Sequence, residues 1–394
     1  MPETTSRSRS RRSAIERIGA LLQHDFPGIL VPLTERLDDL RAGKARALVV
    51  KATELPRLPE DELDHMAFPE AFEVRGLGLR FREGDALLME LRRFYLPPVV
   101  IGGAGPGGTA SMTAAATRAV ADADIVLTDS LCGDEVLESA SSQAEIVHVG
   151  KRCGKASTLQ AEINDHILAN ALCGRRVVRL KGGDPSVFGR LEEEIGTLSD
   201  RRLSYQVLPG VGAASGAAAF IGHPLTAREI ASELILSTGR LAGGGKNPFP
   251  LKGAAAPAIA LYMSRKVLVS RMKDLENAGY PPNTPVAVVE KLGSPRARAV
   301  TGTITTIADI ADAQNVGTPA VVLVGAQYAK PTHLPLHGVR VWLPAETETA
   351  GTQRLPLEAL GAVCVQRPLI EPVPLPVEEG ALLSESFDWV LFTS

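Results

Sequence analysis

Short runs of β-branched residues alternate with helical patterns from about Pro98 to Gln327, and this alternation constrains the fold more than any other feature. Strands that alternate with helices predict an α/β fold with a largely parallel sheet and crossover connections. About 230 residues is long for one such sheet, so breaks at Pro209-Gly210 and in Leu241–Gly253 favour two lobes. The predicted strands are Pro98–Ile101, Asp124–Thr128, Glu145–Val149, Arg176–Leu180, Ser204–Leu208, Glu233–Thr238, Ala258–Met263, Val286–Glu290 and Ala320–Val324.

The segments before and after this alternating region show different sequence patterns. The first contains a short predicted strand at Ala47–Val50, and the last opens with a proline-punctuated linker after Ala329. Predicted strands at Val339–Leu343, Val363–Gln366 and 388–393 follow the linker, and a compact domain rarely ends inside a buried strand. We therefore expect an N-terminal segment over residues 1–97, a central domain over 98–329 with lobes of about 98–209 and 210–329, and an incomplete α/β module over 330–394.

Composition narrows the class of protein. The 394 residues are 45% hydrophobic and 22% charged, which is typical of a globular chain. An aromatic content of 4% and a net charge of −3 argue against nucleic-acid and membrane partners. The four cysteines, Cys132, Cys153, Cys173 and Cys364, form no CxxC pair or metal-ligand set, so we expect no metal and a reducing cytoplasm. No run of 18 apolar residues is present to span a membrane.

Two glycine-rich turns follow predicted strands. The first, in VVIGGAGPGGTASMT, is not a dinucleotide fingerprint because Pro106 interrupts the GxGxxG pattern, and a tight strand–helix connection explains it equally well. The second, in VVRLKGGDPSVFGR, places Gly182, Gly183 and Asp184 at the carboxyl end of a strand, where parallel sheets bind ligands. Arg179, Lys181 and Arg190 add positive charge there. A functional interpretation is favoured for this second turn.

An acid and a base follow two neighbouring predicted strands. Asp129 comes directly after the strand ending at Thr128, and Lys151 comes soon after the strand ending at Val149. Such a pair can move protons or hold an anionic substrate, although a solvated ion pair is the simpler interpretation of these two residues alone. A further stretch from Leu208 to Thr226 holds small residues that permit close packing or a flat ligand; its His223 favours a structural role.

Taken in order, these segments resemble the uroporphyrinogen-III C-methyltransferase family of the tetrapyrrole methylase superfamily. The matching blocks are GAGPG, ADIVLTD, VGKRCG, QAEIN, RVVRLKGGDPSVFGR, VLPGVGAASGAAA, HPLT, STGR, ALYM, TPVAVVE, VTGTI and TPAVVLVG. The resemblance implies a two-lobed α/β fold with the active site between the lobes, S-adenosylmethionine as methyl donor and a homodimer. It implies methylation of the tetrapyrrole uroporphyrinogen III at C2 and C7, giving precorrin-2 for sirohaem or cobalamin.

The resemblance also implies roles for individual residues. Asp129 matches the family's proton acceptor and Lys151 its proton donor. Because the substrate carries eight carboxylates, Arg152, Arg179 and Arg190 suit it as partners. Cofactor contacts are expected at Pro106, Gly182, Gly183, Asp184, Val187, Gly212, Ala213 and Met263.

Departures from the family pattern leave other functions open. Gly108 stands where the family has the acid of GPGD, and Thr128-Asp129-Ser130 lacks the tyrosine and arginine of YDR. One alternative is a module that binds the cofactor or a tetrapyrrole without turnover. Another is a methyltransferase for a different precorrin or, less in keeping with the composition, for ribosomal RNA.

The flanking segments carry fainter resemblances. Residues 338–394 resemble the opening of uroporphyrinogen-III synthase, and only part of that family's length is present. Residues 14–75 resemble the first lobe of hydroxymethylbilane synthase. No cysteine precedes Cys132 to anchor that family's cofactor, so we expect a remnant.

Overall fold

The chain divides into two compact units, Met1–Thr332 and His333–Ser394. Lys151, Arg152 and the last predicted strand, 388–393, lie outside the described residues. The limits predicted for the three domains stay predictions. The computed structural model describes residues 14–25, 31–34, 45, 47–51, 63–67, 77–82, 85–106, 108–149, 160–239, 256–294, 296–329, 335–336, 339–344 and 347–366.

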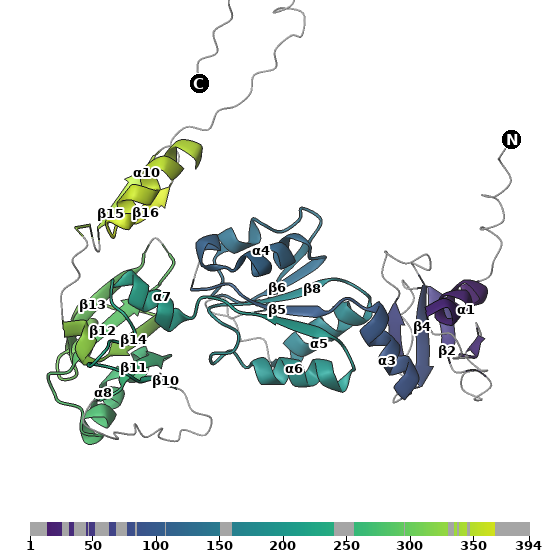
Figure 1. Ribbon diagram of the computed structural model, residues 1–394, viewed down its shortest axis with the longest axis horizontal. Helices are drawn as coiled ribbons and strands as arrows, with labels where there is room; N and C mark the ends of the chain where they lie inside the picture. The colour runs from purple at the N-terminus through teal and green to yellow at the C-terminus, as the bar shows by residue number, and fades with distance from the viewer. Residues whose placement is uncertain are drawn as a thin grey trace, which may run out of the picture. The chain divides into compact units, whose positions relative to one another are not determined.

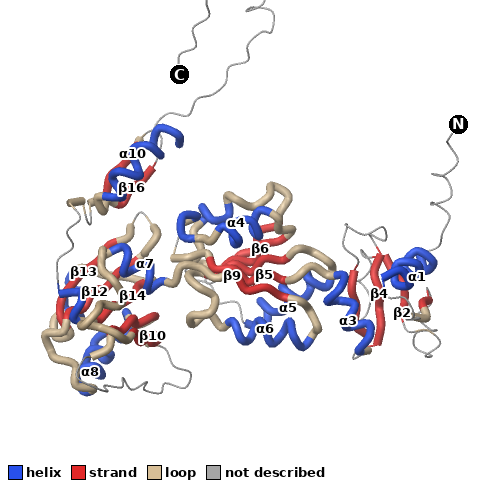
Figure 2. Tube along the Cα trace, viewed as in Figure 1, coloured by secondary structure: helices blue, strands red, loops and turns tan. Residues whose placement is uncertain are grey.

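The first lobe is an open, fully parallel sheet with the strand order β7-β6-β8-β5-β9. Its central strands β6 and β8 are buried along their whole length, as expected for a sheet covered on both faces. Figure 2 shows α4 on one side of the sheet and α5 and α6 on the other. The elements are β5 (Val99–Gly103), α4 (Ala114–Ala121), β6 (Ile125–Thr128), β7 (Glu145–His148), α5 (Gln160–Leu172), β8 (Val177–Lys181), α6 (Leu191–Asp200) and β9 (Tyr205–Leu208), with 3₁₀ turns η3 (Thr109–Ser111) and η4 (Asp134–Leu137).

The second lobe is also an α/β layer, but its sheet is mixed (Figure 1). Only β10 and β11 run parallel, and the pairs β11–β14, β12–β14 and β12–β13 are antiparallel. The strand order is β10-β11-β14-β12-β13. The elements are α7 (Ala213–Phe220), β10 (Leu234–Thr238), β11 (Ala258–Tyr262), η6 (Arg265–Val267), α8 (Leu268–Asn277), β12 (Pro285–Glu290), β13 (Arg298–Thr303), α9 (Ile307–Ala313), β14 (Ala320–Val324) and η7 (Ala326–Ala329).

The α/β fold predicted from the sequence is confirmed, and the expectation of a largely parallel sheet is wrong for the second lobe. The link from β12 to β13 is too short for a parallel crossover, which needs a dozen or more residues, so these two strands form an antiparallel pair. Strand β13 was not predicted because it lies at the sheet edge and is mostly exposed or half-buried. Its polar sequence therefore lacks the apolar run that reveals the other strands.

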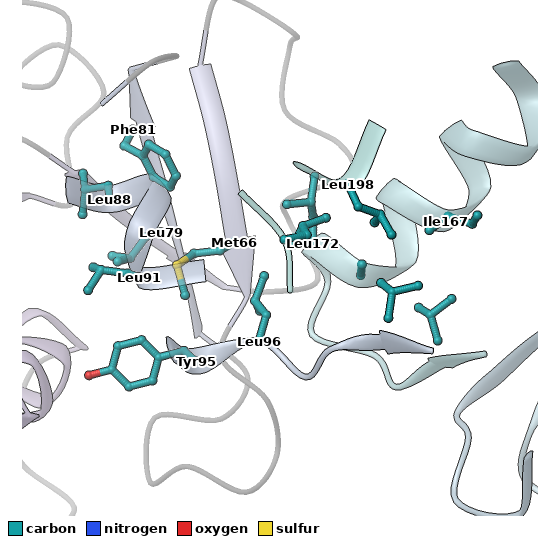
Figure 3. Packing of buried hydrophobic residues seen from close by; sticks show 14 of the residues in the cluster. Met66, Leu79, Phe81, Leu88, Leu91, Tyr95, Leu96, Ile167, Leu172 and Leu198 are labelled. Carbon is teal, nitrogen blue, oxygen red and sulfur yellow. The ribbon is translucent and has the colours of Figure 1, made fainter. Parts of the chain in front are cut away.

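In the described residues before Pro97, the elements are a four-stranded sheet and the helices α1 and α3. The strand order is β1-β2-β4-β3, with β1 and β2 parallel and the other pairs antiparallel. The elements are α1 (Ala14–Asp25), β1 (Leu33–Thr34), β2 (Ala47–Lys51), β3 (Leu63–Ala67), β4 (Leu77–Arg82) and α3 (Ala86–Tyr95). One continuous cluster of buried apolar side chains joins this sheet to the first lobe; Figure 3 shows Met66 and Leu96 on one side and Leu172 and Leu198 on the other.

A buried arginine reinforces this junction. Arg92 on α3 is fully buried, lies over the ring of Phe81, and donates hydrogen bonds to the carbonyls of His65 (2.9 Å) and Arg201 (3.0 Å). Leu96, Leu172 and Arg201 each precede a strand of the first lobe. The N-terminal elements therefore pack at the amino ends of the parallel strands and leave the carboxyl ends clear.

The second unit is a small β-α-β segment. Strands β15 (Arg340–Leu343) and β16 (Val363–Gln366) pair in parallel, and α10 (Thr347–Ala359) connects them. Both strands lie where the sequence predicts them. Among the described residues of the whole chain, no helix is long and apolar enough to cross a bilayer.

An ion pair fixes the start of two adjacent strands in the first lobe. Asp124 precedes β6 and accepts hydrogen bonds from the backbone N–H of Arg176 (2.8 Å) and from its guanidinium (2.6 Å), just before β8. These bonds from Arg176 hold the pKa of the Asp124 carboxyl below its usual value, although partial burial opposes them.

Replacing Asp124 with Asn is expected to lower the urea midpoint at neutral pH. A carboxyl whose pKa is depressed by folding contributes stability above its unfolded pKa of about 3.9, and this contribution is lost as the pH falls through the folded pKa. The deficit of Asp124→Asn relative to wild type should therefore shrink below about pH 4. Asp165→Asn, an exposed position on α5 with the same loss of charge, is the control. An equal deficit at every pH would contradict the assignment.

Candidate active site

The loops after β5, β6, β8 and β9 meet at one edge of the first-lobe sheet, because all its strands run in the same direction. A cavity of about 340 Å³ opens there, and residues of the second lobe supply the rest of its wall. The residues that line it are Gly105, Pro106, Asp129, Leu131, Gln160, Arg179, Lys181, Gly182, Gly183, Asp184, Val187, Phe188, Gly189, Arg190, Ala213, Tyr262, Met263, Val289, Leu292, Pro319, Ala320 and Val321.

Main-chain contacts between glycines bring the loops together. Gly105 and Gly183 exchange two backbone hydrogen bonds, of 3.1 and 2.7 Å. A Cβ on Gly103 would lie 2.6 Å from the carbonyl oxygen of Gly183 and 2.6 Å from the backbone of Gly210. Gly105 and Gly183 also have positive φ angles, +69° and +74°, which other residues rarely adopt. These glycines therefore allow the three loops to approach one another closely.

Asp184 ties two of these loops together. One of its carboxylate oxygens accepts from the backbone N–H of Gly210 (3.2 Å), in the loop after β9. The other accepts from the backbone N–H of Ser186 (2.8 Å) and from the Ser186 hydroxyl. The negative charge at the cavity wall is therefore held in a fixed position.

Two carboxylates and two cations form a linked cluster in the wall. Asp129 lies 3.6 Å from the Arg179 guanidinium, and Glu194 accepts from both Arg179 (3.2 Å) and Lys181 (2.7 Å). The side chain of Asp129 is 23% exposed, whereas those of Arg179, Lys181 and Glu194 are 5%, 5% and 0% exposed. Asp129 is therefore the member of the cluster that is most open to the cavity.

Burial shifts the pKa of one member of this cluster and of a neighbouring thiol. Burial lowers the pKa of the Lys181 ammonium and the nearby Arg179 guanidinium lowers it further, while Glu194 opposes both. Burial and the adjacent Asp129 carboxylate raise the pKa of the Cys132 thiol to about 12. The thiol therefore stays neutral at physiological pH, and it lies 3.5 Å from an oxygen of Asp129.

The second lobe contributes a mostly apolar wall. The phenol of Tyr262 accepts a hydrogen bond from the backbone N–H of Ala214 (3.1 Å), and its ring lies 5.1 Å from that of Phe188. Phe188 and Met263 have positive φ angles and large exposed side chains beside the cavity. Arg190 also has a positive φ. Unusual backbone of this kind concentrates at ligand sites.

Residues 98–308 match the family of tetrapyrrole (corrin/porphyrin) methylases. The chain belongs to this family. Siroheme synthase 2 of Cronobacter sakazakii is 40% identical over 227 residues, which are 58% of this chain and 49% of that protein. Siroheme synthase of Escherichia coli is 37% identical over 227 residues, with the same coverage. The chain thus spans about half the length of these curated relatives. The structure of a cobalt precorrin-4 methyltransferase matches with a TM-score of 0.53 and 25% identity, covering 59% of this chain and 96% of that one.

Most residues that the sequence assigns to the methylase site lie together. Gly212 does not line the cavity; it precedes α7 as its N-cap residue, next to Ala213. Lys151 and Arg152 lie outside the described residues. The predicted residues that line the cavity are Pro106, Asp129, Arg179, Gly182, Gly183, Asp184, Val187, Arg190, Ala213 and Met263.

Sequence reasoning missed two polar residues at the candidate site: Glu194, which lies behind the cavity wall, and Tyr262, which lines the cavity. Glu194 is one of three consecutive glutamates at the start of α6, and nothing in the sequence distinguishes it from its exposed neighbours. Tyr262 directly precedes Met263, so the ALYM block did point to its neighbourhood. In the apolar wall, Val289 and Pro319 to Val321 lie in the matching blocks TPVAVVE and TPAVVLVG, but none of these residues was singled out as a site residue.

Gly103→Ala is expected to lower stability by about 2 kcal/mol or more, because the added methyl group meets rigid main chain on two sides. The matched control is Gly196→Ala. That glycine lies within α6 with nothing within 4 Å of an added Cβ, so the change should stabilise by roughly 0.5–1 kcal/mol. Urea unfolding of both variants checks this, and equal effects would contradict the close contact of the three loops.

Proposed function

We propose that the chain is an S-adenosylmethionine-dependent C-methyltransferase that methylates uroporphyrinogen III at C2 and C7 to give precorrin-2. One observation carries the proposal: a single cavity holds Asp129, the Gly182-Gly183-Asp184 turn and Met263. Membership of the tetrapyrrole methylase family and similarity to siroheme synthases support it. Assembly as a homodimer is part of the proposal.

The residues of the cavity fit the proposed methyl donor. A volume of about 340 Å³ lies within the roughly 300–1,000 Å³ of small-molecule sites. Leu131, Val187 and Met263 offer apolar surface to an adenine ring, and the glycine turns offer backbone groups without side chains. The donor supplies a methyl group already activated by a sulfonium. The remaining tasks of the chain are to align the acceptor carbon and to remove a proton.

Asp129 is the proposed acceptor of that proton. Its carboxylate borders the cavity and is the most open group of the charged cluster. Methylation of a pyrrole carbon leaves the ring cationic until a proton is lost, and a carboxylate suits this step. Lys151, as the proton donor, remains a proposal from the family pattern.

Among the described residues that line the cavity, Arg190 is the exposed cation, and it is the proposed partner of a polyanionic substrate. Its side chain lines the cavity, is 59% exposed, and pairs with the surface residue Glu193 at 2.6 Å. A substrate carboxylate can replace an exposed partner of this kind at low cost. Arg179 lines the same cavity, but its guanidinium is buried and bonded within the wall. These contacts favour a role for Arg179 in holding Asp129 in place, and they argue against a direct contact between Arg179 and the substrate.

A second candidate is methylation of a later precorrin. The structural likeness to a cobalt precorrin-4 methyltransferase favours it. The two candidates share the donor and differ in the acceptor, so acceptor competition separates them.

The decisive assay incubates the full chain anaerobically with methyl-labelled S-adenosylmethionine and, separately, uroporphyrinogen III or a later precorrin. We expect label in precorrin-2 above a boiled control. Label only in the later precorrin would replace the proposal with the second candidate. Calorimetric binding of S-adenosylhomocysteine without label in any acceptor would leave a binding module and contradict catalysis.

Asp129→Asn is expected to lower kcat by about 10²–10⁴-fold, the range for loss of a general base. S-adenosylhomocysteine affinity should stay close to wild type, because Asn keeps the shape of the side chain. Rapid-quench turnover and calorimetry measure the two quantities. Unchanged kcat would remove Asp129 from the mechanism.

A further inference from the structure

The buried Glu194 carboxylate has no part in the chemistry described so far. It lies in the first turn of α6, and its side chain is fully buried. One of its oxygens accepts from the Arg179 Nε (3.2 Å), the Lys181 Nζ (2.7 Å) and the Gln160 Nε2 (3.3 Å). Glu194 therefore joins β8, α5 and α6 at a single atom.

Stability alone does not account for this cluster. Taking several charges out of water is costly, and apolar residues of similar volume are often as stable or more stable. Arg179 and Lys181 lie two residues apart on β8 and so share a face, which apolar side chains could fill equally well. In some proteins buried ionic groups instead fix a specific geometry, and this cluster lies beside the cavity.

The contacts of Arg179 indicate what is being fixed. Its Nε is held by Glu194, and its Nη1 donates to the carbonyl of Leu180 at 2.7 Å. Two bonds on different nitrogens set the plane of a guanidinium. The remaining nitrogen, Nη2, then lies 3.6 Å from the Asp129 carboxylate.

We propose that Glu194 is a positioning residue: it fixes the Arg179 guanidinium, which in turn orients the Asp129 carboxylate toward the cavity. This inference rests on the proposed function, in which Asp129 accepts the proton. It assigns Arg179 to the support of Asp129 and gives a reason for the glutamate buried in α6.

The test compares Glu194→Gln with Glu192→Gln, an exposed glutamate on the same helix. We expect Glu194→Gln to lower kcat on the order of 100-fold, the cost of a small misplacement, while KM stays close to wild type. Glu194→Asp, which keeps the charge, should recover part of the rate. Glu192→Gln should match wild type. A rate loss that Glu194→Asp does not recover in part, or a loss that appears in KM and not in kcat, would overturn the positioning role.

A crystal structure of Glu194→Gln tests the same inference without activity. We expect the Arg179 guanidinium to turn away from Asp129, and an unchanged contact between them would overturn the proposal. If the wild-type chain shows no turnover, the proposed function fails while this structure still decides the positioning role. If Glu194→Gln does not fold, the double variant Lys181→Met/Glu194→Gln, which keeps the net charge, takes its place in both measurements.

Discussion

Three segments of main chain touch directly at Gly103, Gly183 and Gly210, and the cavity depends on that contact. A Cβ on Gly210 would lie 2.3 Å from the carbonyl oxygen of Gly183. The loops can therefore come this close only because these positions carry no side chain. Protein interiors are close-packed and yield little, so a wider spacing there would carry Asp184 and Pro106 with it. The parallel sheet brings the loops to one edge, and the glycines set how close they come.

The wall of the cavity combines this rigid backbone with a balanced set of charges. Asp129, Arg179, Lys181 and Glu194 form two carboxylates and two cations in continuous contact. The apolar wall of the second lobe, from Tyr262 to Val321, lines the same cavity.

Much of the fold and part of the candidate site could be predicted from the sequence. The rest could not be predicted, for physical reasons. The nine predicted strands of the two lobes lie within two residues of the observed ones, because fully buried strands such as β6 and β8 show as runs of β-branched and apolar residues. The direction of a strand produces no comparable pattern in the sequence, so the antiparallel pairing of β14 with β11 and β12 was not predicted. Asp129 and Asp184 could be placed because each follows a strand. Glu194 could not be placed from the sequence, because it becomes buried only when α6 packs over β8.

The N-terminal elements meet the first lobe at the amino ends of its strands, through Arg92 and a shared apolar cluster. That end of a parallel sheet holds none of the residues that line the cavity. A lineage could therefore acquire, trim or exchange a fused neighbour at this face by recombination, while selection on the reaction acts at the opposite rim. A domain fused at this junction would leave the residues that line the cavity unchanged.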